Sequence, residues 1–175
     1  MIFTRMNIKT EAMMTDLSEL IENIQESHAA LRDAIETAKP YWEENCLPPE
    51  ADEINPRATG DSWSPQQASN HVCSALSYFS SLVAKPLGLN FLHTPPNVND
   101  AQVALESLDK IVASNKLVLD AVNDQNLSYA TDISDMSVIF ALSHGYKIDK
   151  TIEGALRLMS LHSFDHAKQI KTAKL

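Results

Sequence analysis

Two histidines and an aspartate stand within five consecutive residues in LHSFDHAKQI, the stretch from Leu161 to Ile170. His162 and His166 are four residues apart, so on a helix they share one face with their Cβ atoms roughly 6 Å apart. Two imidazoles at that spacing can bind one metal ion through a nitrogen each. The stretch lacks the glutamate of H-E-x-x-H, so a zincin-like protease is not indicated.

A third histidine faces inward on a second predicted helix. His71 lies about seven residues into that helix, on the stripe that also carries Ala75 and Leu82. An unpartnered buried imidazole costs roughly 1–3 kcal/mol, and a metal ion removes that cost because it takes up one ring nitrogen. We therefore predict His71, His162 and His166 as metal ligands. The alternative is that each is an ordinary core histidine with hydrogen-bond partners.

The other titratable candidates have two interpretations each. His28 lies on the inner stripe of the first predicted helix. It could be a fourth metal ligand or a general acid or base near the site, or it could be a core histidine with hydrogen-bond partners. Asp165 adjoins His166 and could orient an imidazole or reach the metal, or be a partly solvated carboxylate. We expect His93 and His144, which fall in or beside connections, at the surface.

Apolar spacings of three, four and seven predict a first helix from Thr15 to about Lys39, followed by a long proline-containing connection over residues 40–62. The second helix begins at Pro65, with Ser64 as N-cap and Gln67 closing a capping box. A third helix fits residues 99–122, capped by Asn99 or Asp100.

In the remainder of the chain, the sequence pattern predicts one short helix and one long helix. MSVIFAL, within residues 126–150, fits a short helix or a strand, of which we favour the helix. The last helix spans about Asp149 to Thr172, with Asp149 or Thr151 near its start. The fold class predicted is all-α, an antiparallel four-helix bundle with a long first connection and a short extra helix before the last one. Residues 1–14 are expected to be a flexible segment and residues 15–175 a single domain.

Composition narrows the function classes. Lys and Arg number 14 against 23 Asp and Glu, a net charge of −9 that disfavours nucleic acid as a partner. No apolar run is long enough to span a membrane, and no signal peptide is evident. The two cysteines, Cys46 and Cys73, suit a reduced compartment and are poor candidates for activated nucleophiles. We expect a cytoplasmic protein.

WSPQQASNHV, from Trp63 to Val72, together with LHSFDHAKQI resembles the two signatures of the DinB/YfiT-like superfamily. The resemblance implies a four-helix bundle in which His71, His162 and His166 hold one divalent ion, commonly zinc or nickel, in a cleft at one end. Some proteins of that superfamily are similar to transferases or isomerases that use low-molecular-weight thiols, and many have no assigned activity.

The function expected is therefore that of a DinB-like, metal-dependent enzyme acting on a small-molecule substrate. Transfer of a thiol is the first reaction to expect and metal-assisted hydrolysis the second, because an open metal site can activate either nucleophile. The alternative, from another class, is a non-catalytic helical binding or stress-response protein. A homodimer is also expected, from the outward aromatic ring of Phe164.

Overall fold

The computed structural model describes residues 16–46 and 63–174. The predicted flexible segment 1–14 and most of the 40–62 connection lie outside the described residues. Within them the protein is all-α, with an isolated bridge between Ala130 and Thr151 and no strand. The helices are α1 (Leu17–Ala38), η1 (Lys39–Tyr41), α2 (Pro65–Ala84), α3 (Ala101–Leu119), α4 (Asp135–Ser143), α5 (Ile152–Lys171) and η3 (Thr172–Lys174).

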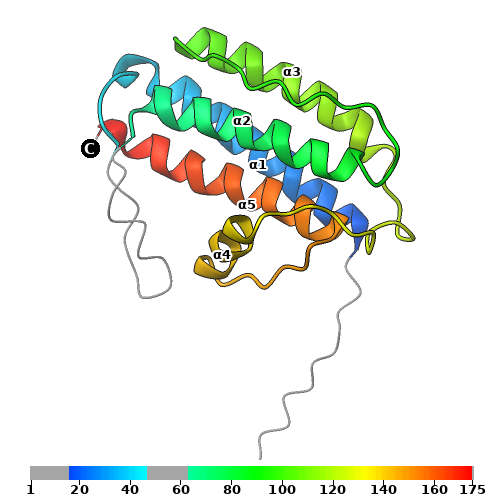
Figure 1. The fold of residues 1–175 in the computed structure, drawn as a ribbon. Helices are drawn as coiled ribbons and strands as arrows, with labels where there is room; N and C mark the ends of the chain where they lie inside the picture. Colours follow the sequence, from blue (N-terminus) through cyan, green and yellow to red (C-terminus); the bar gives the residue numbers. More distant parts are fainter. Residues whose placement is uncertain (1–15, 47–62, 175) are drawn as a thin grey trace, which may run out of the picture.

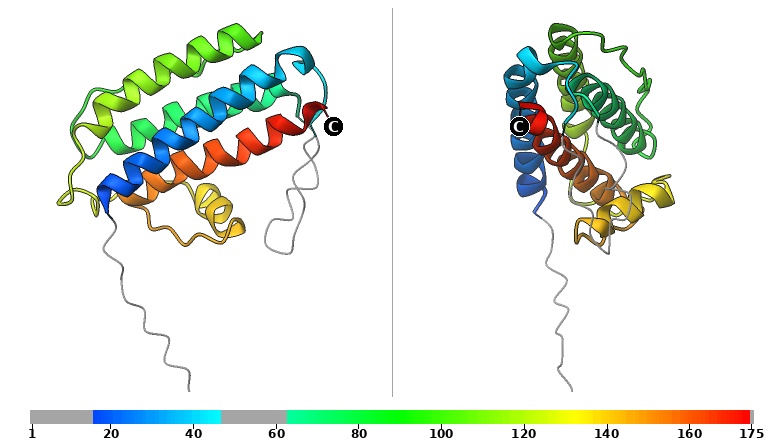
Figure 2. Two further views of the ribbon diagram at one scale, coloured as in Figure 1. Left: turned by 180° about the vertical axis from the view of Figure 1, so that it is seen from behind. Right: turned by 90° about the vertical axis from the view of Figure 1, so that its left-hand side faces the viewer.

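The four long helices lie side by side, and the short α4 sits against α5 (Figures 1 and 2). Helices α1 and α5 run in one direction and α2 and α3 in the other (Figure 1). Contacts at the helix ends agree with this: Gln66 at the start of α2 donates to the carbonyl of Asn99, just before α3, and Lys171 at the end of α5 pairs with Asp33. The expected antiparallel order thus holds between the two pairs, whereas the helices within each pair are parallel.

Parallel neighbours need a connection that travels the length of a helix, and residues 85–100, which we call the strap, make it between α2 and α3 (Figure 1). Gly88 begins the strap with a φ of 69°, a conformation that costs glycine no strain. At the other end, Val98 N–H donates to Asn70 Oδ1 over 3.1 Å. The strap is therefore fixed along α2.

Helix starts follow the capping chemistry of the sequence. The predicted capping box is confirmed: Ser64 Oγ accepts from Gln67 N–H, and Gln67 Oε1 accepts from Ser64 N–H. Asp100 caps α3. The last helix begins at Ile152 and is capped by Thr151, three residues later than the predicted start at Asp149. The MSVIFAL segment is helical, as favoured, and forms most of α4.

The core lies between α1, α2, α3 and α5, where large apolar side chains are fully buried, among them Ile24, Leu31, Leu76 and Leu156. The start of α5 is tightly packed, since a Cβ atom on Gly154 would lie 2.0 Å from the carbonyl oxygen of Asp149. Only glycine lets α5 begin so close to the preceding turn. This start fixes the rotation of α5 and hence the face that its histidines present.

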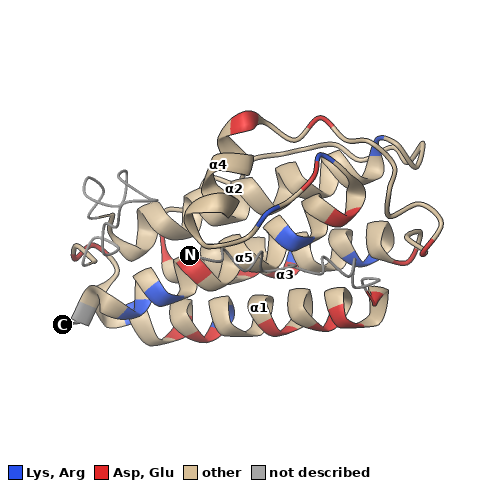
Figure 3. Ribbon diagram, turned by 90° about the horizontal axis from the view of Figure 1, so that it is seen from below, with Lys and Arg blue, Asp and Glu red and all other residues tan. Residues whose placement is uncertain are grey.

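Charge is concentrated on the outside of the bundle. Acidic residues recur along the exposed face of α1, at Glu19, Glu22, Glu26, Asp33 and Glu36 (Figure 3). None of the described helices combines the length and the apolar character needed to cross a membrane.

Candidate metal centre

His71, His162 and His166 come together between α2 and α5. One nitrogen from each ring lies within 4.8 Å of the others, so the three side chains could hold a metal ion. The Nε2 atoms of His71 and His162 are 3.0 Å apart. Two nitrogens that bind one ion at about 2.1 Å lie roughly 3.0–3.4 Å apart in octahedral or tetrahedral geometry, so this spacing fits shared ligation.

Gln169, one turn beyond His166, sets the orientation of that imidazole. Gln169 Oε1 lies 2.9 Å from His166 Nδ1, and as an acceptor it fixes the proton on Nδ1. Nε2 of His166 then carries the free lone pair that a metal needs. The H-x-x-x-H spacing alone did not show this contact, although an acceptor three residues after a histidine on the same buried face is a signal for it.

Aromatic rings enclose the cluster. Trp63, which directly precedes the N-cap of α2, stacks on His166 with ring centres 5.8 Å apart and an angle of 12°, and its centre lies 4.8 Å from that of His71. Phe79 and Phe140 present their edges and faces to His162 at 5.7 and 4.9 Å. His162 and His166 are buried, whereas His71 is exposed. The site is therefore apolar on the α5 side and open at His71.

Burial keeps the two α5 imidazoles neutral. It lowers the pKa of His162 well below the usual 6.5, and repulsion from His166, His71 and His144 acts in the same direction. Burial also lowers the pKa of His166, opposed by the charge of Asp165 and the hydrogen bond to Gln169. Neutral imidazole is the form that binds metal, so both side chains are ready as ligands at neutral pH.

One buried atom in the cluster lacks a partner among the residues that the structure describes. His162 Nδ1 makes no hydrogen bond to any of them, while its Nε2 points at His71. A buried imidazole with one uncompensated nitrogen is costly for a purely structural role. An ion bound through the facing Nε2 atoms of His71 and His162 would leave Nδ1 of His162 unpaired, so the fit to a metal ion rests on the donor geometry, with three imidazole nitrogens within 4.8 Å of one another.

Asp165 lies beside the cluster and contacts a different histidine. Its Oδ1 accepts from His144 Nε2 over 2.9 Å, and His144 Nδ1 lies 2.9 Å from the carbonyl oxygen of Phe140. Asp165 thus joins α5 to the end of α4, the helix that brings Phe140 onto His162. We expected His144 at the surface, and its partly buried position follows from the path of α4, which the sequence does not specify.

His28 is buried on α1 and does not belong to the three-histidine cluster. Burial lowers its pKa from 6.5 to about 4, and its Nε2 has no hydrogen-bond partner within residues 16–46 and 63–174. Both cysteines are free and buried. Burial raises the pKa of Cys46 to about 11 and that of Cys73 to about 12, so neither thiol is ionised at neutral pH.

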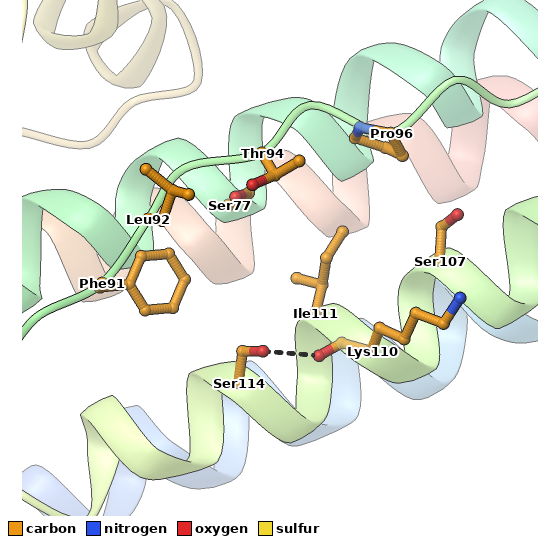
Figure 4. Close-up of a pocket in the computed structure, with 9 residues that line it drawn as sticks. All are labelled: Ser77, Phe91, Leu92, Thr94, Pro96, Ser107, Lys110, Ile111 and Ser114. Carbon is orange, nitrogen blue, oxygen red and sulfur yellow. Dashed lines mark hydrogen bonds between the residues drawn. The ribbon is translucent and has the colours of Figure 1, made fainter.

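Several hollows flank the strap, among them these two. One, of about 340 Å³, lies between the strap and α3, with Phe91 and Ile111 facing each other across it (Figure 4). The other, of about 260 Å³, adjoins the histidine cluster and is lined by His71, Ser74, Ala75, Tyr78 and His93. His93, expected in an ordinary surface connection, is thus next to the candidate site. The path of the strap along α2 brings His93 to this position.

The chain matches no protein-family model, no curated protein and no solved structure. What stands is an all-helical protein with three clustered histidines, two of them buried, that could hold a metal ion.

Proposed function

We propose that His71, His162 and His166 bind one divalent ion and that the protein is a metal-dependent enzyme acting on a small molecule. The observation that carries this proposal is the convergence of three imidazole nitrogens from two helices within 4.8 Å. Zinc and nickel are our choices for the ion, because imidazole nitrogen suits both. Three protein ligands would leave room for water or substrate, as in catalytic zinc sites.

The ion would supply Lewis acidity, which lowers the pKa of a bound water or thiol. The chain's own residues would hold the site in shape. Gln169 orients one imidazole, and the rings of Trp63 and Phe140 restrict water on the buried side. Because both cysteines stay protonated, the nucleophile in this proposal is not a cysteine of the chain but a molecule bound at the ion.

A low-molecular-weight thiol is our first nucleophile and water our second. The proposed activity is accordingly transfer of a thiol to an electrophilic small molecule, with hydrolysis as the runner-up. The proposal includes membership of the DinB/YfiT-like superfamily, supported by Trp63 stacked over the histidines and by the positions of the three ligands. A cytoplasmic protein with no nucleic-acid or membrane partner accords with the net charge of −9 and the two free cysteines.

A non-catalytic binding protein with a structural metal is the competing function. Structural zinc sites usually have four protein ligands. Among the described residues the cluster offers three, which favours an open site. Spectroscopy of cobalt-substituted protein separates the two, since an open site changes its visible spectrum when azide is added and a closed one does not.

Elemental analysis of protein purified without chelator or histidine tag tests the metal proposal. We expect about one zinc or nickel per chain in the native protein, and loss of most of it in His166→Ala. His93→Ala is the matched control and should keep the metal, because His93 lies outside the cluster. Absence of metal from the native protein after incubation with both ions, or equal metal in native and His166→Ala, would overturn the proposal.

A further inference from the structure

The hollow beside His71 has a wall built from one stripe of α2 and one strap residue. His71, Ser74, Ala75 and Tyr78 follow each other at helical spacings of three, one and three along α2, so their side chains share one face. His93 closes the hollow from the strap. Because His71 belongs to both, this hollow of about 260 Å³ opens directly onto the histidine cluster.

His93 is held in place by a buried hydroxyl. Its Nδ1 lies 3.0 Å from Ser77 Oγ, and Ser77 is buried on α2. The ring of Tyr78 stands nearly perpendicular to that of His93 at 6.2 Å. Figure 4 shows Ser77 beneath the strap close to Thr94, the residue after His93. The side chain of His93 is therefore positioned by α2, although its backbone belongs to a connection.

Three polar groups in this hollow have no partner within the described chain. These are the hydroxyl of Ser74, the hydroxyl of Tyr78 and Nε2 of His93, whose Nδ1 is already engaged. All three can donate a hydrogen bond, and no carboxylate lines the hollow. A few converging polar groups in a concave site are what fixes the orientation of a small ligand.

We propose that this hollow binds the substrate through an sp² oxygen, a carboxylate or carbonyl, which accepts hydrogen bonds from Tyr78, His93 and Ser74. Its reacting end then lies toward His71. The substrate class this defines is a small molecule that carries a carbonyl or carboxylate near its reactive carbon. The orienting role of the hollow rests on the proposed function, whereas the binding itself does not need the ion.

Ligand-observed NMR titration measures this binding, with benzoate, benzamide and benzylamine as probes, on metal-free and zinc-loaded protein. Benzoate offers an anionic carboxylate oxygen and benzamide a neutral carbonyl oxygen, so the two probes show which the hollow prefers. Benzylamine has the same ring but no oxygen. We expect at least one of the two oxygen-bearing probes to bind tenfold more tightly than benzylamine. Tyr78→Phe and His93→Ala should each weaken that binding about threefold to tenfold, the effect of one lost hydrogen bond. Thr94→Ala, the neighbouring exposed strap residue, is the control and should bind like the native protein.

Equal binding of all three probes, no binding, or binding unchanged by both Tyr78→Phe and His93→Ala would overturn the proposal. Tyr78→Phe removes only a hydroxyl, so its result does not depend on a fragile fold. Metal content measured on the same samples separates this proposal from the proposed function. If the native protein takes up neither zinc nor nickel but binds benzoate through Tyr78 and His93, the hollow is sustained and the metal enzyme is rejected. If it takes up metal but binds none of the probes, the metal site is sustained and the hollow is rejected.

Discussion

Gln169 is the side chain that orients His166, and its loss should weaken metal binding. Without the acceptor at 2.9 Å, His166 can rotate and change tautomer. Losing such a partner typically costs 10–100-fold in metal affinity. We expect Gln169→Ala to show that loss in a zinc competition assay with a chromophoric chelator, and Gln169→Glu, which keeps an acceptor oxygen, to recover most of it. Equal affinities for Gln169→Ala and native protein would contradict this role.

His28 makes the stability of the bundle depend on pH. Its pKa is about 4 in the folded protein and 6.5 as a free side chain, so between these values the unfolded chain binds more protons. The stabilising contribution is therefore complete above pH 6.5 and is lost as the pH falls toward 4. A change of one unit corresponds to about 1.4 kcal/mol, so between pH 7.5 and 5 the loss is about 2 kcal/mol.

Urea unfolding of the native protein and His28→Leu at these two pH values measures the contribution. The native protein should lose about 2 kcal/mol more than the variant on acidification, because leucine removes the titrating ring and its unpaired nitrogen. His162 and His166 titrate in both proteins, so their contribution cancels in the difference between the native protein and His28→Leu. Parallel losses in the two proteins would show that His28 is paired or solvated.

At the scale of elements, Asp165 holds α4 on α5 together with the ring contact between Phe140 and His162. Helix α4 is otherwise loosely attached, with only Ala141 and Ser143 buried among its residues. We expect Asp165→Ala to speed amide hydrogen exchange over residues 135–146, because the bond to His144 is lost. His144→Ala should have the same effect. Metal content should stay near the native value in both, and its loss in Asp165→Ala alone would assign Asp165 to the metal instead.

The helices were predictable wherever an apolar stripe and a cap coincide in the sequence. Ser64 with Gln67 specifies the start of α2, and the stripe of Ile24, Leu31 and Ile35 specifies α1. The last helix was predicted to start three residues too early, because the turn at Asp149, which lies against Gly154, has no periodicity of its own. Helix periodicity also placed the three histidines on faces that meet, which is why the cluster could be predicted, although His71 is exposed and not buried as its stripe had predicted.

Connections carry the part of the site that the sequence did not predict. The positions of His93 and His144 depend on the strap and on α4, whose courses follow from long-range contacts such as Asn70 with Val98. The predicted antiparallel order of the four helices was correct only between the two pairs, because a helix pattern has the same period read either way and does not specify direction. The parallel arrangement of α2 and α3 follows from the length of the strap.

For the whole molecule, α4 presents a surface suited to self-association. Met136, Ile139 and Leu142 are 45%, 52% and 47% exposed on this one short helix. We predict a homodimer that buries them, and expect Ile139→Glu to shift the mass measured by light scattering after size exclusion from dimer to monomer. Leu117→Glu, on α3 and 73% exposed, is the control and should remain a dimer. A native monomer at all concentrations would contradict this prediction.

The distance in sequence between the clustered histidines bears on how the protein matures. His71 and His162 are 91 positions apart, and the strap, α3 and α4 all lie between them. A ribosome that has completed α2 has delivered one of the three donors, and the pair on α5 follows only after those intervening elements have been made. Capture of an ion by all three donors would therefore have to follow synthesis of α5. An ion that joins donors so far apart in sequence would close a large loop of the chain. It would act as a reversible cross-link formed late in synthesis, and because it binds the folded chain it would favour the folded state.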